Sequence, residues 1–395
     1  MVKGMKRTEI GLVPEDWEVR ELGEVGAVRM CKRIFQNQTA EYGEIPFFKI
    51  GTFGKEPDAF ISRKLFEEFK SKFSYPKVGD ILISAAGTIG RTVVYDGEER
   101  YYQDSNIVWI DNEENIISNR LLKYVLDIVS YNTEGGTIQR LYNSILRSTK
   151  FVCPPLPEQE AIAGALTDAD AWIESLEQLI AKKRLIKQGA MQELLTPKEG
   201  WEVKKLGEIA KYRRGSFPQP YGLDKWYDDT NGMPFIQVFD VGKNRKLKLE
   251  TKRKISKLAQ AMSVFVPKES IVLTLQGSIG RIALTQYDAY CDRTLLIFES
   301  IDYALDKFFF LLVVEQLFEI EKEKAPGGTI KTITKEALSD FDIGFPSSLS
   351  EQTRIATILS DMDADLEALE QQLHKARQIK QGMMQELLTG RVRLA

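Results

Sequence analysis

Residues 158–196 read EQEAIAGALTDADAWIESLEQLIAKKRLIKQGAMQELLT, and this stretch decides the fold of the chain. Its apolar residues recur at alternating spacings of four and three: Ile162, Leu166, Ala169, Ile173, Leu176 and Ile180. Such a repeat keeps one face of a helix turned toward a second helix, as in a coiled coil. Pro157 and the acidic residues that follow it suit a helix start. The stretch therefore predicts one long helix, which at about 1.5 Å per residue would measure roughly 58 Å.

A second copy of this helix stands near the other end of the sequence. Residues 350–389 carry an equivalent apolar seam: Ile355, Leu359, Met362, Leu366, Leu369 and Leu373. The two helix endings, residues 192–196 and 385–389, are identical. Since neither helix can bury its seam alone, we expect each helix to be the partner of the other.

The repeat extends over the rest of the chain. Residues 16–24 return at 200–208, residues 87–91 at 277–281, and residues 135–138 at 327–330. The blocks keep their order, which indicates an internal duplication. Other stretches differ strongly between the copies, above all residues 53–73 and 240–257. One scaffold with two different surfaces suits the recognition of two different targets.

The predicted fold class is α+β, with two globular domains separated by an antiparallel pair of long coiled-coil helices and an internal pseudo-two-fold repeat. We place the globular domains at residues 1–156 and 198–346, and the helical segments at 157–197 and 347–395. A parallel helix pair would need a long return connection, whereas residues 195–201 pass directly from the first helix into the second domain.

The layout of the two copies is cyclic. Residues 13–17 resemble the continuation that follows the first helix and that the second helix lacks. We therefore expect the two ends of the chain to lie close together.

Composition excludes several classes of protein. The chain has 395 residues with 54 basic and 57 acidic side chains, so it is no polycation, although a local basic patch would still suffice to bind nucleic acid. It has three cysteines without a CxxC pair, and His374 is the only histidine, predicted to lie on a solvated helix face. These counts disfavour a disulfide framework, a metal site and a Ser-His-Asp triad. The longest apolar run, residues 308–314, is too short to span a membrane. The few, widely spaced cysteines suit a reducing compartment, and we expect a cytoplasmic protein.

The blocks together resemble the specificity (S) subunit of type I restriction–modification systems. The resemblance lies in Trp-Glu-Val-x-x-Leu-Gly-Glu at 17–24 and 201–208, in residues 79–90 and 153–163, and in the helix ends 191–196 and 384–389. It covers nearly the whole chain.

This resemblance implies a DNA-specificity subunit that is not itself an enzyme. Each globular domain, called a target-recognition domain, would read one half of a bipartite site in double-stranded DNA. The helices would fix the half-site spacing and dock two modification (methyltransferase) subunits, and restriction subunits (an ATP-dependent translocase and nuclease) would join them. The chain itself would need no cofactor, while the assembled complex would use S-adenosylmethionine, ATP and Mg²⁺.

Clustered cations are the candidates for DNA contact, because phosphates are bound chiefly by Lys and Arg. The largest cluster, residues 243–257, lies in a divergent stretch. The predicted DNA-binding residues of the second domain are Arg213, Arg214, Lys243, Arg245, Lys246, Lys248, Lys252, Arg253, Lys254 and Arg281. Those of the first domain are Arg33, Arg63, Lys64, Lys72 and Arg91. The alternative for these clusters is a solvated loop, and the alternative for Arg91 and Arg281 is the end of a tight turn.

Two further sets of residues have more than one interpretation. Trp172, beside the seam, either packs under a globular domain or anchors a modification subunit. Asp58, Glu68 and Lys70 fit the loose Pro-Asp…Glu-x-Lys pattern of Mg²⁺-dependent nucleases, although the second copy does not repeat it. The alternatives to a DNA-specificity subunit are therefore such a nuclease and a structural coiled-coil adaptor with two protein-binding heads.

Overall fold

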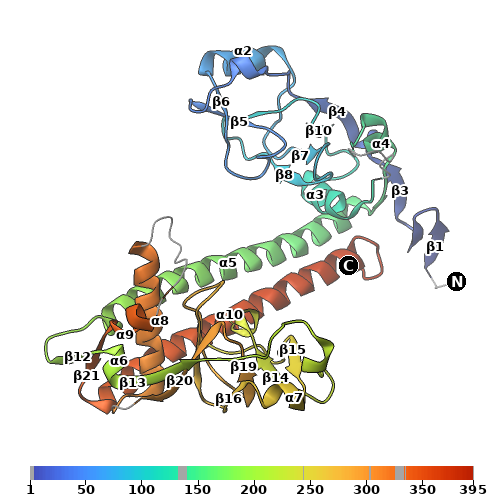
Figure 1. Cartoon of the computed structure of the whole chain (residues 1–395). Helices are drawn as coiled ribbons and strands as arrows, with labels where there is room; N and C mark the ends of the chain where they lie inside the picture. The colour runs from blue at the N-terminus through green and yellow to red at the C-terminus, as the bar shows by residue number, and fades with distance from the viewer. Residues whose placement is uncertain are drawn as a thin grey trace. The chain divides into compact units, whose positions relative to one another are not determined.

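A computed structural model describes residues 4–131, 140–242, 244–301, 304–324, 333 and 335–394. The chain forms two compact units, residues 1–176 with 372–395, and residues 177–371. Each long helix gives one half to each unit, and each unit contains one globular domain. Helices and sheets are both present, as the predicted α+β class requires (Figure 1).

The first domain is built on a sheet with the strand order β4–β10–β7–β8. These strands are β4 (Gly26–Met30), β7 (Ile81–Ser84), β8 (Thr92–Val94) and β10 (Ile107–Asn112). Successive side chains of a strand point to opposite faces. Ile81 and Ile83 accordingly join the core beneath helix α3 (Asn119–Ile128), whereas Leu82 joins an aromatic core formed with a second, smaller sheet. Strand β7 is therefore buried on both faces.

The other elements of the first domain surround this sheet. They are β1 (Met5–Thr8), β2 (Gly11–Pro14), β3 (Glu18–Glu21), α1 (Leu22–Val25), η1 (Gln36–Gln38), β5 (Ile45–Phe48), β6 (Phe60–Ile61), α2 (Arg63–Lys72), β9 (Tyr101–Tyr102), α4 (Asn143–Ser148) and β11 (Lys150–Cys153). Strands β5 and β9 run parallel in the smaller sheet, and β3 pairs with β11 beside the long helix.

The second domain repeats this topology. Its main sheet has the order β13–β20–β17–β18, and a parallel β14–β19 pair again lies in the smaller sheet. Its elements are β12 (Trp201–Lys205), α6 (Leu206–Ile209), β13 (Ala210–Arg214), η2 (Asp224–Trp226), β14 (Met233–Ile236), η3 (Val238–Asp240), β15 (Arg253–Ile255), α7 (Lys257–Gln260), β16 (Val264–Val266), β17 (Ile271–Thr274), β18 (Ile282–Leu284), β19 (Ala289–Cys291), β20 (Leu295–Ile301), α8 (Lys307–Lys324), α9 (Lys335–Ser339) and β21 (Asp342–Pro346). The same strand order in both domains confirms the internal repeat.

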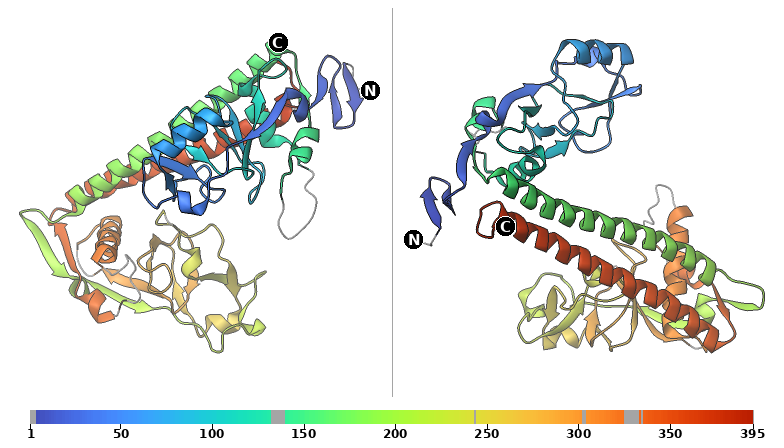
Figure 2. Two further views of the ribbon diagram at one scale, coloured as in Figure 1. Left: turned by 90° about the horizontal axis from the view of Figure 1, so that it is seen from above. Right: turned by 180° about the vertical axis from the view of Figure 1, so that it is seen from behind.

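Helices α5 (Leu156–Leu195) and α10 (Leu349–Leu387) match the two predicted long helices to within two residues at each end. They lie side by side in every view (Figures 1 and 2). In the second unit Lys183 pairs with Asp365 at 2.7 Å, while farther along α5 Leu195 shares a core with Ile355. Residue numbers thus rise along one helix as they fall along the other, which confirms the antiparallel pairing.

The first unit shows the same antiparallel order. Lys380 pairs with Asp170 at 2.5 Å, and earlier on α5 Ile162 shares a core with Leu387. Ile162 and its counterpart Ile355 are both fully buried, because each lies where a globular domain packs against its helix. His374 is exposed on α10, as predicted.

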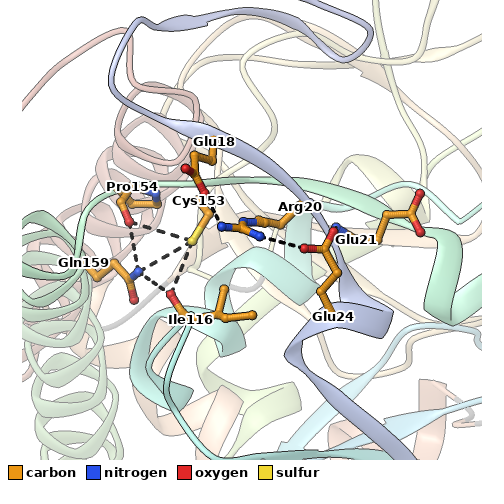
Figure 3. A network of polar contacts seen from close by, with 8 residues as sticks. All are labelled: Glu18, Arg20, Glu21, Glu24, Ile116, Cys153, Pro154 and Gln159. Atoms are coloured by element: carbon orange, nitrogen blue, oxygen red, sulfur yellow. Dashed lines mark hydrogen bonds and ion pairs between the residues drawn. The ribbon is translucent and has the colours of Figure 1, made fainter.

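A buried glutamine joins each globular domain to the start of its long helix. The Gln159 side-chain amide donates to the carbonyls of Ile116 at 2.8 Å and Pro154 at 2.9 Å (Figure 3). Its side-chain oxygen accepts the Ser118 N–H at 3.0 Å. Buried backbone groups without a partner are costly, so this one side chain satisfies three of them.

The second copy uses the equivalent residue in the same way. Gln352 donates to the Pro346 carbonyl at 2.8 Å and accepts the Asp306 N–H at 2.7 Å. Both glutamines are almost inaccessible to solvent. The repeated Glu-Gln pair is therefore a structural feature of the helix junction.

The end of the chain contacts its beginning through what we call the Arg393 cluster: Asp16, Trp17, Glu158 and Arg393. Arg393 donates to Glu158 at 2.6 and 2.7 Å and to Asp16 at 2.8 and 2.9 Å. The Trp17 ring N–H donates to the buried Glu158 carboxylate at 2.8 Å. This contact confirms the expectation that the two ends lie close together.

Candidate nucleic-acid interface

The described part of the basic stretch of the second domain, residues 241–242 and 244–252, forms a loop that leads into β15, and we call it the 241–252 loop. Buried Asp240 closes this loop at its base. One carboxylate oxygen accepts the Lys252 N–H at 3.0 Å, the other accepts the Gln237 N–H at 2.9 Å, and the Asp240 carbonyl accepts the Lys248 N–H at 2.9 Å. Burial raises the pKa of Asp240, and the backbone donors oppose this rise.

Three predicted lysines of the 241–252 loop are exposed. Lys248 and Lys252 extend over the half-exposed ring of Phe239, with their ammonium groups 5.9 and 5.0 Å from its centre. Lys246 lies 3.5 Å from Glu367 of α10, close enough for a weak ion pair. Phe239 was not among the predicted residues, although an aromatic residue directly before a cation-rich stretch is a usable signal.

One predicted cation next to this loop is partly neutralised. Arg253 lies 3.2 Å from Asp229 and stacks on the Tyr227 ring at 3.8 Å. Lys254 also contacts Asp229, but through its backbone N–H at 2.9 Å and not through its ammonium group. Both side chains are half-buried. Lys243 lies outside the described residues.

Arg245 corrects the sequence prediction. Its guanidinium is only 6% exposed and pairs with Glu315 of α8 and Asp363 of α10, and Lys187 of α5 also pairs with Asp363. A cation enclosed by two carboxylates has no free face for a phosphate. Arg245 therefore ties the loop to two helices instead of meeting DNA, because the chain turns its side chain inward between two exposed neighbours.

The predicted cations of the first domain are more often paired with a carboxylate than those of the second domain. Three of the predicted residues have a carboxylate partner: Arg33 with Asp104 at 2.5 Å, Arg63 with Glu99 at 2.8 Å, and Lys72 with Glu68 at 2.9 Å. Lys64 is exposed. These pairings lower the local positive potential, so the first domain presents a weaker cationic surface than the 241–252 loop.

The arginines after the two glycine turns occupy equivalent places. The Arg91 N–H donates to Ser84 Oγ at 2.9 Å, and the Arg281 N–H donates to Thr274 Oγ1 at 3.0 Å. The Arg91 guanidinium also donates to the Phe53 carbonyl at 2.8 Å. The interpretation of these stretches as tight turns is confirmed.

Two predicted arginines end strand β13. Arg213 and Arg214 are both exposed, and Arg213 lies 3.7 Å from Glu299. The pairing is long and exposed, so it compensates Arg213 only weakly.

The residues of the nuclease-like pattern do not gather into a site. Asp58 pairs with Lys49 at 2.9 Å, Glu68 pairs with Lys72 at 2.9 Å, and the Lys70 ammonium lies over two aromatic rings. Among the described residues, no group of three or more His, Cys, Asp or Glu side chains has the arrangement of a metal site. The geometry does not support the nuclease alternative.

Other sequence expectations concern cysteines, membranes and Trp172. The three cysteines are buried and free. In the part of the chain that the structure describes, no helix is long and apolar enough to cross a membrane. Trp172 is 46% exposed on α5.

Comparison with known proteins defines the class of protein. The model of the type I restriction modification DNA specificity domain matches residues 14–183 and 198–378, one match for each copy. The chain therefore belongs to this family and is a specificity subunit of a type I restriction–modification system.

Individual relatives belong to the same class of protein. A Haemophilus influenzae protein named as a type I restriction enzyme specificity subunit is 58% identical over 162 residues, which span 41% of this chain and 42% of that protein. The MjaX specificity subunit of Methanocaldococcus jannaschii is 26% identical over 99% of this chain and 97% of its own length. The crystal structure of an S subunit from M. genitalium has the same fold, with a TM-score of 0.58, 15% identity, and coverage of 98% of this chain and 99% of that one.

Proposed function

We propose that each globular domain reads one half of a bipartite site in double-stranded DNA, and that the helix pair fixes the spacing between the halves. The observation that carries this proposal is the duplication itself. Both domains have the same strand order and the same buried glutamine junction, yet their loops differ. Two copies of one frame with unlike surfaces suit two unlike half-sites, and stiff helices suit a fixed separation.

The phosphate contacts of the second half-site come from the exposed cations near the 241–252 loop. Lys246, Lys248 and Lys252 point to solvent, and Arg213 and Arg214 add charge on β13. Release of counterions from DNA by such cations supplies affinity without sequence preference. In the first domain Lys64 and the partly paired Arg33, Arg63 and Lys72 serve the same purpose with less free charge.

The modification subunits dock on the exposed sides of the long helices. Apolar residues on α5 that lie outside the seam support this: Leu179, Leu185 at 70% exposure and Ile186. Trp172 stands seven residues before Leu179, on the same side of the helix. Exposed apolar side chains at this spacing are typical of a helix that meets a partner.

A groove in the second unit offers a further docking surface. It has a volume of about 1350 Å³ and lies between α5, α8 and α10, with Met191, Phe308 and Leu366 among its lining residues. Its mixed polar and apolar lining suits a protein partner.

The chain acts without catalytic residues and without a cofactor of its own. In the assembled complex the modification subunits transfer methyl groups from S-adenosylmethionine, and restriction subunits use ATP and Mg²⁺.

The test is site binding by the chain assembled with its modification subunits. Selection from random duplexes should enrich a split motif, and lengthening its spacer by one base pair should weaken binding strongly. The insertion moves the half-sites by about 3.4 Å and rotates one against the other. Exchange of residues 200–346 for those of another S subunit should change one half-site only. Equal affinity for both spacers would refute the fixed separation, and enrichment of no motif would favour a structural adaptor.

A further inference from the structure

The 241–252 loop presents a leucine to solvent at its tip. Leu249 is 97% exposed, the highest value among the large apolar side chains that the structure describes. Leu247, two residues earlier, is buried in the domain core. The domain therefore does not need Leu249 for its packing. In the isolated protein, the exposure of this apolar side chain to water is unfavourable.

Hydrogen bonds hold the loop on both sides of this leucine. Before it, the Leu247 N–H donates to Gln286 at 2.8 Å, and the Lys248 carbonyl accepts the Tyr287 hydroxyl at 2.8 Å. After it, Thr251 donates from its hydroxyl to the Arg253 carbonyl at 2.8 Å.

The base of the loop is held as well. The Lys248 and Lys252 N–H groups both bond to Asp240, at 2.9 and 3.0 Å. Arg245 anchors the start of the loop in its buried ion pairs. A loop that is held in place before binding loses less conformational entropy when it binds.

The surroundings of Leu249 are cationic. Lys246, Lys248 and Lys252 are exposed on the same loop, against the single acid Glu250. Half-exposed Phe239 lies beneath two of these lysines. An apolar tip between cations complements a DNA groove, in which base edges lie between two rows of phosphates.

We propose that Leu249 is a specificity-determining residue of the second domain, which enters a DNA groove and packs against base edges while Lys248 and Lys252 meet the flanking phosphates. The inference rests on the proposed function, since it assigns a base contact to the domain already proposed to read a half-site. Among base edges, the thymine methyl group in the major groove is the apolar feature that a leucine can read.

The experiment compares four forms of the chain, each assembled with its modification subunits: wild type, Leu249→Ala, Lys252→Ala and Leu12→Ala. Leu12 is a matched control, because it is also an exposed leucine but lies on strand β2 of the first domain. Each complex is used to select sites from random duplexes, and its affinity for the wild-type site is then measured.

Leu249→Ala should relax the base preference at one or two neighbouring positions of one half-site and weaken binding to the wild-type site by about tenfold. Replacing thymine by deoxyuridine at those positions should weaken DNA binding by the wild type and leave binding by Leu249→Ala unchanged. Lys252→Ala should weaken binding to all sequences alike, and Leu12→Ala should change neither the affinity nor the preference. Thermal stability should stay the same in Leu249→Ala, because its side chain packs against nothing in the domain.

Two results would overturn the inference: an unchanged base preference in Leu249→Ala, or a uniform loss of affinity without a change in preference. Either result would leave the proposed function intact. If the wild type enriched no motif, the proposed function would fail and this inference with it.

Discussion

Asp170 and Asp363 occupy the same position in the two copies of the long helix, yet the two domains use them differently. Each pairs with an equivalent lysine of the opposite helix, Lys380 and Lys187. From the first domain, Asp170 receives the hydroxyl of Tyr124 on α3 at 2.8 Å, and half-exposed Lys123 on the same helix forms only a longer pair with it, at 3.4 Å. From the second domain, Asp363 receives the buried guanidinium of Arg245.

This difference shows which parts of the fold the duplication keeps and which it leaves variable. The helix-to-helix pair and the buried glutamine belong to the shared scaffold. The contact between each domain and its helix is instead made by whichever side chain the variable part supplies. A neutral hydroxyl and a buried cation have very different costs when they are removed, so the two copies should respond differently to mutation.

The largest effect is expected for Arg245→Met. It leaves Glu315 and Asp363 without their main cation in a partly buried site, and breaking a buried ion pair costs about 3–5 kcal/mol. Denaturant unfolding should show a loss of this size for the second unit. The matched change in the first unit, Tyr124→Phe, removes one hydrogen bond and should cost only about 1 kcal/mol. Equal losses in the two variants would contradict the contrast between the copies.

The second prediction concerns the shared scaffold, where the copies should behave alike. Gln159→Leu and Gln352→Leu each leave buried backbone groups unsatisfied, at about 1–3 kcal/mol per group with partial relaxation, so each should destabilise its unit by about 2–4 kcal/mol. Gln371→Leu, at an exposed position on α10, is the control and should change stability by less than about 0.5 kcal/mol. A large loss in only one of the two junction variants would show that the junctions are not equivalent.

The third prediction concerns Glu158 and Glu351, which precede these glutamines in the sequence and have different partners in the two copies. Glu158 belongs to the Arg393 cluster, whereas Glu351 pairs with Arg354 at 2.7 Å on its own helix. Arg393→Ala leaves the buried Glu158 with a single partner and should cost about 1–3 kcal/mol, but Arg354→Ala removes a solvent-exposed pair and should have a much smaller effect.

This effect should depend on pH. The hydrogen bond from Arg393 holds the pKa of Asp16 below its ordinary value of 3.8. A carboxyl with a lowered pKa in the folded state stabilises the protein above its unfolded pKa and loses that contribution as the pH falls through the folded pKa. The stability gap between wild type and Arg393→Ala should therefore be full at neutral pH and shrink below about pH 4. A gap that widened on acidification would contradict this assignment.

The smallest effect is on the salt dependence of DNA binding. Lys248→Ala with Lys252→Ala should lower the slope of log affinity against log salt concentration by about 2, because each lost phosphate contact removes about one counterion. Arg33→Ala with Lys72→Ala in the first domain should lower it less, since both residues already have carboxylate partners. Titrations at several salt concentrations check this, and a larger change for the first-domain pair would reverse the comparison.

The architecture was largely predictable from the sequence because its signals are local or repetitive. The spacing of Ile162, Leu166 and Leu176 marks a helix seam at any place in the chain, and repeated blocks reveal a duplication without any knowledge of contacts. The short connection of residues 195–201 excluded a parallel helix pair by length alone.

The individual site residues were less predictable. Lys246 and Arg245 are neighbours in one basic stretch, and nothing in their order along the chain separates them. Only the path of the 241–252 loop turns Lys246 outward and Arg245 inward. The carboxylates that Arg245 meets, Glu315 and Asp363, lie 70 and 118 residues away in the sequence. Leu249 was not predicted, because a leucine in a loop has no local pattern that shows whether it is buried.

The sequence by itself determined that this protein consists of two copies of one α+β unit, with long helices in antiparallel partnership and basic loops that differ between the copies. These properties follow from periodicity, chain connectivity and charge, which are written along the chain. The tertiary structure alone decided which cations are free, which glutamines close the helix junctions and how the last residues meet Trp17. Those outcomes depend on burial and on partners distant in sequence, and burial is what decides whether a charged or polar side chain must be satisfied inside the protein or is left for a ligand.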